Sequence, residues 1–120
     1  MSELALIVED DQDLANIFAE ALRGVGFEVE LVPDGKLALE RLKNDIAPFL
    51  ILLDMHLPYV SGADLLSIIK EDEKFAKTTI IITTADARMG DMYSNDVDFV
   101  LIKPISFVQL RDLTARLKSK

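Results

Sequence analysis

Cysteine is absent from this sequence of 120 residues. Its absence excludes a disulfide framework, thiol catalysis and cysteine-ligated zinc or iron–sulfur sites. The sequence also lacks an apolar run long enough to cross a bilayer, and its first residues, MSELALIVEDD, turn acidic where a signal peptide would still be apolar. We therefore expect a soluble, cytoplasmic protein that does not use a membrane as its partner.

Positive charge is also scarce. Lysine and arginine number 13 against 21 aspartates and glutamates, which gives a formal net charge of −8 at pH 7. This balance argues against direct binding of nucleic acid and suits a site that gathers carboxylates around a cation.

Repeats, low-complexity tracts and linkers are missing as well. Because half of the residues are hydrophobic, we expect one compact domain with a buried core over residues 1–120.

Two kinds of segment alternate along the chain. Short apolar or alternating runs predict strands, and apolar residues at helical spacing between them predict helices. The expected strands are residues 4–8, 28–32, 49–53, 79–83 and 99–102. The helical stripes are residues 14–22, 38–42, 65–69 and 107–117, with a weaker one, which contains Gly90, at residues 85–95.

This alternation is typical of an α/β domain with a parallel sheet covered on both faces. The run EVELV carries charge on alternate residues, which suits an edge strand, whereas the other four runs are more apolar. A flavodoxin-like (βα)5 doubly wound sheet with strand order 2-1-3-4-5 satisfies this pattern. Ligands of such sheets bind at the carboxyl ends of the strands, here between the first and third strands.

Polar residues follow the predicted strands at the ends where a ligand would bind. They are, in chain order, Glu9, Asp10, Asp11, Asp54, Thr84 and Lys103. Taken singly, each is ordinary as a helix cap, a turn residue, a strand threonine or a surface lysine. Their meeting at four adjacent strand ends, after strands with apolar interiors, indicates one shared site.

The chemistry of that site follows from charge. The carboxylates of Glu9, Asp10 and Asp54 would repel one another by up to about 4 kcal/mol per close pair at an effective dielectric constant near 20. Such a group takes up a proton or a cation, and hard oxygen ligands favour Mg²⁺, with Mn²⁺ as the second choice. With Lys103 as a mobile cation and Thr84 as a hydroxyl donor, the set suits a phosphoryl group and makes Asp54 a candidate nucleophile.

With these residues the chain resembles a response-regulator receiver domain, the CheY-like phosphoacceptor of two-component signalling. The resemblance rests on the motifs LIVEDD, LLDMHLPYVSG, ITTAD and IKP, in that order and across essentially the whole chain. It implies that Asp54 accepts a phosphoryl group from a sensor histidine kinase, a phosphotransfer protein or a small phosphodonor. It also implies a regulatory protein, not an enzyme with a separate substrate, that switches contacts with an unknown output target or forms a phosphorylation-dependent homodimer.

The resemblance further implies a role for each residue of the site. Glu9 and Asp10 are the acidic pair, with Asp10 the direct ligand of Mg²⁺. Thr84 is the switch hydroxyl, and Lys103 contacts the phosphoryl oxygens. The bond between Lys103 and Pro104 is expected to be cis, an isomer that is accessible mainly before proline.

His56, the one histidine of the sequence, invites assignment as a metal ligand through its imidazole. The resemblance instead implies that the backbone carbonyl of His56 binds the metal, while the side chain stands at the rim of the pocket. Asp86 lies two residues beyond Thr84, also at the rim. We expect the side chains of His56 and Asp86 to tune how fast water reaches the acyl phosphate.

Three departures from the family pattern stand out. Receiver domains usually have tyrosine or phenylalanine three residues before the lysine, where this chain has Val100, and Phe99 should point to the opposite face of its strand. The usual coupling of threonine and aromatic ring is therefore in question. The distance along the chain from Thr84 to Lys103 is shorter than usual by roughly one helical turn. Thr79 stands where the family often has proline.

Two other functions compete with this interpretation. Asp11-Gln12-Asp13 superficially offers the D-x-D motif of a Mg²⁺-dependent phosphatase of the haloacid-dehalogenase type, although Asp11 is a bystander in the receiver alignment. A flavin-binding flavodoxin would need a Ser/Thr/Gly-rich phosphate loop after the first strand, and the acidic loop present would repel phosphate. Only Ser119 and Lys120 follow the last predicted helix, which fits a stand-alone receiver and an excised one equally.

Overall fold

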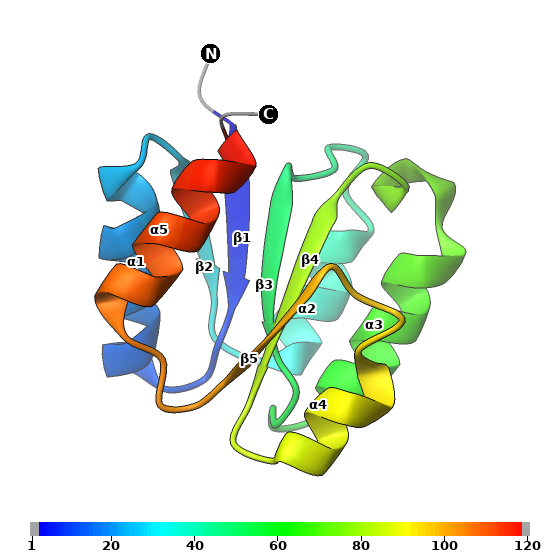
Figure 1. Ribbon diagram of the computed structural model, residues 1–120. Coiled ribbons are helices and arrows are strands. Elements are labelled where there is room, and N and C mark those ends of the chain that lie inside the picture. Colours follow the sequence, from blue (N-terminus) through cyan, green and yellow to red (C-terminus); the bar gives the residue numbers. More distant parts are fainter. Residues whose placement is uncertain (1–2, 119–120) are drawn as a thin grey trace.

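The computed structural model describes residues 3–118, which form a five-stranded parallel sheet with helices on both faces (Figure 1). The strands are β1 (Leu4–Val8), β2 (Glu28–Val32), β3 (Leu50–Asp54), β4 (Thr79–Thr84) and β5 (Phe99–Ile102). Their order is β2-β1-β3-β4-β5, so the predicted flavodoxin-like fold with order 2-1-3-4-5 is confirmed. Ser119 and Lys120, which follow the last helix, lie outside the described residues.

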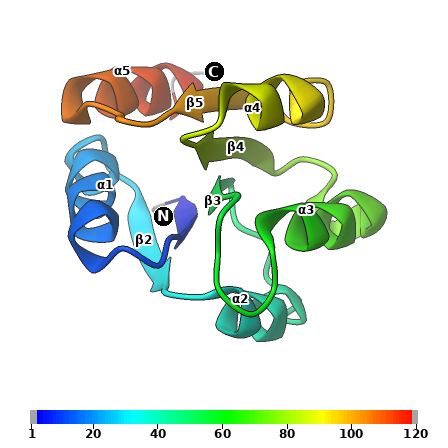
Figure 2. The same cartoon turned by 90° about the horizontal axis from the view of Figure 1, so that it is seen from below.

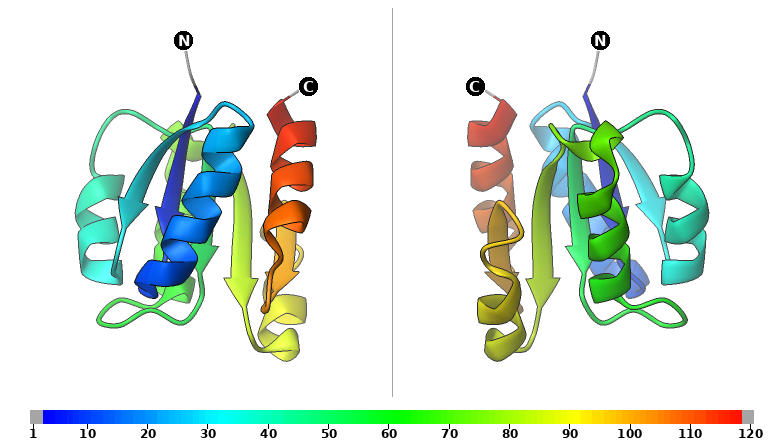
Figure 3. Two further views of the ribbon diagram at one scale, coloured as in Figure 1. Left: turned by 90° about the vertical axis from the view of Figure 1, so that its left-hand side faces the viewer. Right: turned by 90° about the vertical axis from the view of Figure 1, so that its right-hand side faces the viewer.

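Five α-helices connect and cover the strands. They are α1 (Gln12–Gly24), α2 (Gly35–Leu42), α3 (Gly62–Glu71), α4 (Ala87–Tyr93) and α5 (Phe107–Lys118), with a short 3₁₀ turn at Glu73–Phe75. Helices α1 and α5 lie on one face of the sheet and α2, α3 and α4 on the other (Figures 2 and 3). In the part of the chain that the structure describes, no helix is both long enough and apolar enough to span a membrane.

The core is divided by the sheet into two layers, because successive strand residues point to opposite faces. Ile51 and Leu53 of β3 pack toward α2, α3 and α4, whereas Leu50 and Leu52 pack toward α1 and α5. All five residues of β3 are buried. Because full burial of a leucine side chain contributes about 1.5–3 kcal/mol, β3 is held firmly at the centre of the sheet.

Strand β3 begins and ends one residue later than predicted. The sequence placed the strand at residues 49–53, whereas in the structure it begins at Leu50 and includes Asp54. Asp54 pairs with Thr83 of β4, and the next residue, Met55, donates its backbone N–H to the carbonyl of Thr83 at 3.0 Å. The carboxylate thus belongs to a hydrogen-bonded strand and not to a free loop.

Helix α4 is short, as the spacing between Thr84 and Lys103 predicted. It has 7 residues, and Gly90 lies in its middle. A Cβ atom at Gly90 would lie 2.9 Å from Cγ1 of Val100 and 3.1 Å from Cδ1 of Ile102. The glycine therefore allows α4 to pack directly against β5.

Candidate functional site

Three carboxylates meet at the carboxyl edge of the sheet, the edge that faces the viewer in Figure 2. Val8 of β1 pairs with Leu53 of β3, so the residues that follow them, Glu9 and Asp54, emerge side by side. One oxygen from each of Glu9, Asp10 and Asp54 lies within 4.8 Å of the others. Glu9 and Asp54 are only 3% and 2% exposed, whereas Asp10 faces solvent.

Lys103 supplies positive charge to these carboxylates. Its Nζ lies 3.0 Å from Oε1 of Glu9 and 3.5 Å from Oδ2 of Asp54. The lysine follows β5, where its backbone N–H donates to the carbonyl of Thr84 at 2.8 Å, and its bond to Pro104 is cis, as expected. One cationic side chain thus faces two buried carboxylates and a nearby exposed one.

Proton affinity in this cluster is altered by burial and by charge. Burial raises the pKa of Glu9 to about 7, with a further upward contribution from the charge of Asp54 and an opposing one from the hydrogen bond to Lys103. Burial by itself would lower the pKa of Lys103, but its hydrogen bond to Glu9 and the nearby carboxylates outweigh this effect and raise it. A proton on Glu9 or a bound cation therefore relieves the cost of burying this carboxylate beside Asp54.

The loop after β3 holds the carboxylate of Asp54 in place. The backbone N–H of His56 donates to Oδ1 of Asp54 at 3.0 Å. At Gly62, the first residue of α3, a Cβ atom would lie 2.5 Å from the backbone oxygen of Asp54 and 2.5 Å from Cα of Met55. Only glycine permits this approach, so the start of α3 rests on the backbone of the predicted phosphoacceptor.

Thr84, at the end of β4, is fully buried and sits in a polar network. Its Oγ1 lies 3.1 Å from Nε2 of His56 and accepts a hydrogen bond from the backbone N–H of Asp86 at 3.0 Å. The side chain of Asp86 in turn accepts from the N–H of Arg88 at 2.9 Å and caps α4. The sequence pointed to Thr84, His56 and Asp86 but gave no signal for the contact between His56 and Thr84, which are 28 positions apart.

The remaining sequence-predicted residues fall outside the carboxylate cluster. Asp11 caps α1, since its side chain accepts from the N–H groups of Asp13 and Leu14. Val100 packs against the core layer beneath α2, α3 and α4, whereas Phe99 is 37% exposed and does not take its place. Thr79 begins β4 at the opposite edge of the sheet.

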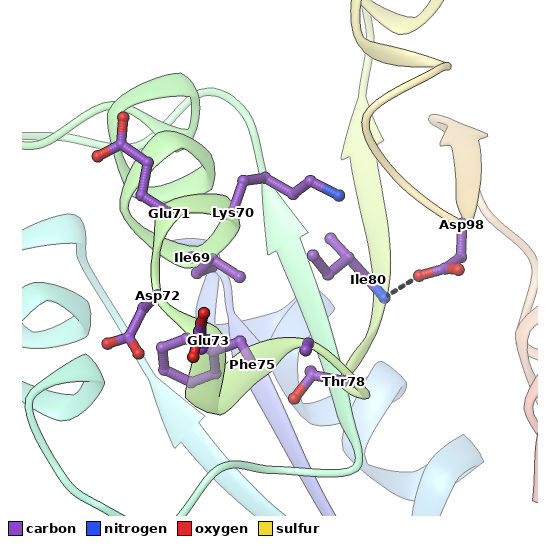
Figure 4. A pocket seen from close by; sticks show the side chains of 10 residues that line it. Ile69, Lys70, Glu71, Asp72, Glu73, Phe75, Thr78, Ile80 and Asp98 are labelled. Atoms are coloured by element: carbon purple, nitrogen blue, oxygen red, sulfur yellow. Dashed lines mark hydrogen bonds between the residues drawn. The ribbon is translucent and has the colours of Figure 1, made fainter.

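A separate cleft of about 260 Å³ opens at the opposite end of β4 (Figure 4). It lies between the end of α3, the 3₁₀ turn and Asp98, whose carboxylate accepts the N–H of Ile80 at 2.7 Å. Ile80 is near the start of β4 and Thr84 at its end. The cleft is therefore distinct from the carboxylate site.

Comparison with known proteins identifies the family. The family described as "Response regulator receiver domain" matches residues 5–115. The probable methanogenesis regulatory protein FilR2 of Methanothrix harundinacea is 34% identical over 125 residues, which cover 96% of this chain and 81% of that protein. The chain therefore belongs to the response regulator receiver domains of two-component systems.

Longer regulators and solved structures agree with this assignment. The DNA-binding response regulator MtrA of Mycolicibacterium smegmatis is 31% identical over 122 residues, all of this chain but 51% of that protein, so the chain spans about half the length of this relative. A CheY-like receiver domain from Methylobacillus flagellatus has 26% identity and a TM-score of 0.83, covering 98% of this chain and 99% of that one. The chemotaxis response regulator CheY4 of Vibrio cholerae, at 20% identity and a TM-score of 0.86 over 98% of this chain and 99% of that one, shares the fold.

Proposed function

We propose that this domain accepts a phosphoryl group on Asp54 and thereby switches its contacts with an output target. The single observation that carries the proposal is the position of Lys103, whose Nζ lies 3.5 Å from Oδ2 of Asp54 and 3.0 Å from Oε1 of Glu9. The arrangement combines a buried carboxylate nucleophile with a cation beside it. We take residues 1–120 as one such domain.

The transfer reaction uses the residues as follows. A carboxylate oxygen of Asp54 attacks the phosphorus of the donor, and the bond from phosphorus to the donor's histidine nitrogen or acyl oxygen breaks as the new P–O bond forms. The leaving group retains the electron pair of the broken bond. Lys103 neutralises charge on the transferred oxygens, and the hydroxyl of Thr84 donates a hydrogen bond to one of them. The donor is a sensor histidine kinase, a phosphotransfer protein or a small phosphodonor.

The donor set at the site fits Mg²⁺. Carboxylate oxygens of Glu9, Asp10 and Asp54 lie close together, and one lysine does not balance their charge. Oxygen ligands of this kind suit Mg²⁺, with Mn²⁺ as the alternative. When bound, the ion would neutralise developing charge on the phosphoryl oxygens. Asp10 and Asp54 would hold the ion directly, and Glu9 would support it. Of the two groups of His56 that could bind the ion, the backbone carbonyl is favoured over the imidazole, because Nε2 of the imidazole already contacts Thr84.

The competing phosphatase hypothesis depends on Asp11 and Asp13. The carboxylate of Asp11 is used to cap α1, where it accepts two backbone N–H groups. Asp11 and Asp13 are exposed, whereas the buried carboxylates at the site are Glu9 and Asp54. These contacts favour phosphoacceptance by Asp54 over turnover of a separate substrate.

Incubation with acetyl phosphate and Mg²⁺, followed by intact-mass analysis, tests the proposal. The wild-type chain should gain one phosphoryl group, Asp54→Asn should gain none, and Asp11→Asn should behave like the wild type. If a phosphatase substrate were turned over by Asp54→Asn but not by Asp11→Asn, the chain would be an enzyme.

Exchanging both His56 and Asp86 for alanine should change the half-life of the phosphorylated state.

A further inference from the structure

His56 makes hydrogen bonds through both its backbone and its side chain, and the two partners have different proposed roles. Its backbone N–H donates to Oδ1 of Asp54 at 3.0 Å, and its ring nitrogen Nε2 lies 3.1 Å from Oγ1 of Thr84. The same residue therefore contacts the proposed phosphoacceptor and the hydroxyl proposed to respond to it. In the part of the chain that the structure describes, no other side-chain nitrogen forms a hydrogen bond with Thr84.

The hydrogen bonds of Thr84 are limited by its chemistry. A hydroxyl has one proton to donate and two lone pairs to accept with. One lone pair receives the backbone N–H of Asp86 at 3.0 Å. Two acceptors near the hydroxyl, the carbonyl of Asp86 at 3.5 Å and Sδ of Met89 at 3.9 Å, are more distant than Nε2 of His56 at 3.1 Å. In the tautomer that leaves Nε2 unprotonated, the hydroxyl can give its proton to Nε2 or to a phosphoryl oxygen on Asp54, but not to both at once. The two partners thus compete for the same proton.

The position usually occupied by an aromatic ring cannot take part in this competition. Val100 has no polar atom, and its Cγ1 lies beneath α4, 2.9 Å from where a Cβ of Gly90 would be. A valine is also stiff about χ1, so it has few alternative positions. Any side chain that responds to movement of Thr84 must therefore lie elsewhere. The imidazole of His56 is in contact with Thr84.

We propose that His56 is the positioning residue for Thr84: its imidazole accepts the Thr84 hydroxyl proton in the unphosphorylated domain and loses that bond when Asp54 carries a phosphoryl group. This proposal rests on the proposed function. Thr84 is linked to α4 because its oxygen accepts the N–H of Asp86, whose carboxylate caps that helix. Release of Thr84 from His56 is thereby transmitted to the start of α4.

Nitrogen NMR of the His56 ring gives a direct readout. The experiment is run at fixed pH with Mg²⁺, before and after addition of beryllofluoride, a stable mimic of the phosphoryl group. We expect the Nε2 resonance of the wild type to move toward the position of a nitrogen without this bond. In Thr84→Val, which keeps the shape and removes the hydroxyl, the resonance should occupy that position before beryllofluoride is added and should not move afterwards.

A matched pair of substitutions tests the energetic consequence. His56→Phe keeps a planar ring and removes both nitrogens, whereas His56→Gln keeps a polar group that can reach Thr84. Since a hydrogen bond of this kind changes an equilibrium by about two- to tenfold, His56→Phe should bind beryllofluoride two- to tenfold more tightly than the wild type. Its α4 amide resonances should also shift toward the bound positions without ligand. His56→Gln should stay within about twofold of the wild type.

The possible failures are distinguishable. If beryllofluoride left the amide resonances next to Asp54 unchanged in the wild type, the proposed function would be overturned together with this inference. If beryllofluoride bound, but the Nε2 resonance stayed in place and His56→Phe bound it with wild-type affinity, only the role of His56 would be overturned.

Discussion

At the scale of single residues, the site has more carboxylates than cationic side chains, and two of these carboxylates are shielded from solvent. Glu9 and Asp54 are almost fully buried, and Lys103 is the cation in contact with both. Burial of an ionised carboxylate is costly unless it is paired or protonated. The raised pKa of Glu9 reflects this cost. Binding of a divalent cation or a proton reduces the cost of burying the carboxylates.

The metal-free domain should become less stable as pH rises from about 4.5 to about 7. The pKa of Glu9 is raised from 4.5 to about 7, so in this range the folded state binds more protons than the unfolded state. The free energy of unfolding therefore falls with rising pH, by on the order of 2–3 kcal/mol in total. Urea denaturation at pH 5 and pH 8 in the presence of a chelator measures the change.

Glu9→Gln is the control for this pH dependence. The substitution removes the titrating group and keeps the shape, so the stability of the variant should change less between pH 5 and pH 8. Equal pH dependence in the two proteins would show that the effect arises elsewhere.

At the scale of elements, two glycines determine how helices approach the sheet. Gly62 brings the start of α3 onto the backbone of Asp54, and Gly90 brings α4 onto β5. Both contacts are too close for an ordinary side chain, although Gly62 faces backbone atoms and Gly90 faces side chains. Because of this difference, a second substitution can make room for a side chain at Gly90 but not for one at Gly62.

Gly62→Ala should destabilise the domain by about 3 kcal/mol or more, because backbone atoms of Asp54 and Met55 cannot move out of the way of a new Cβ. Thermal or urea unfolding measures the loss. Gly24→Ala is the matched control, since nothing lies within 4 Å of a Cβ there and the helix should gain up to about 1 kcal/mol. Similar losses in both variants would contradict this account of Gly62.

Gly90→Ala should lower stability despite the gain in helix propensity. The gain is about 1 kcal/mol, whereas overpacking against Val100 and Ile102 costs about 1–3 kcal/mol. In a Val100→Ala background the nearest clashing atom is gone, so Gly90→Ala should there be neutral or stabilising. A double-mutant cycle measures this coupling, and additive effects of the two substitutions would rule it out.

At the scale of the whole molecule, the sheet order creates the site. The order β2-β1-β3-β4-β5 places the ends of β1 and β3 side by side and brings β4 and β5 next to them. Residues from positions 9 to 103 thereby meet at one edge, although they are distant in sequence. A ligand that binds there contacts several elements at once and should stabilise the fold as a whole.

Mg²⁺ should raise the free energy of unfolding, by about 2.7 kcal/mol at a free concentration one hundred times its Kd. Asp10→Asn should abolish this gain, because it removes the exposed carboxylate of the cluster, while metal-free stability changes little. Denaturation with and without Mg²⁺ measures the effect. Asp13→Asn, an exposed aspartate outside the cluster, is the control and should keep the full gain.

Much of this arrangement could be read from the sequence. Apolar runs alternating with helical stripes predicted the fold, because a parallel sheet buried on both faces requires that pattern. The position of Asp54 at the end of the most apolar run predicted the edge at which the carboxylates meet. The end of β3 was placed one residue early, because hydrophobicity stops at Leu53 while the hydrogen-bonded ladder continues through Asp54.

The sequence by itself thus determined the elements, their order and the residue types at the strand ends, since periodicity and burial are properties of local pattern. Only the tertiary structure decided that Nε2 of His56 contacts Thr84 and that Gly90 lies over Val100. These contacts depend on rotamers and on distances between packed elements. No spacing along the chain encodes them, because each joins segments brought together only when the sheet is assembled.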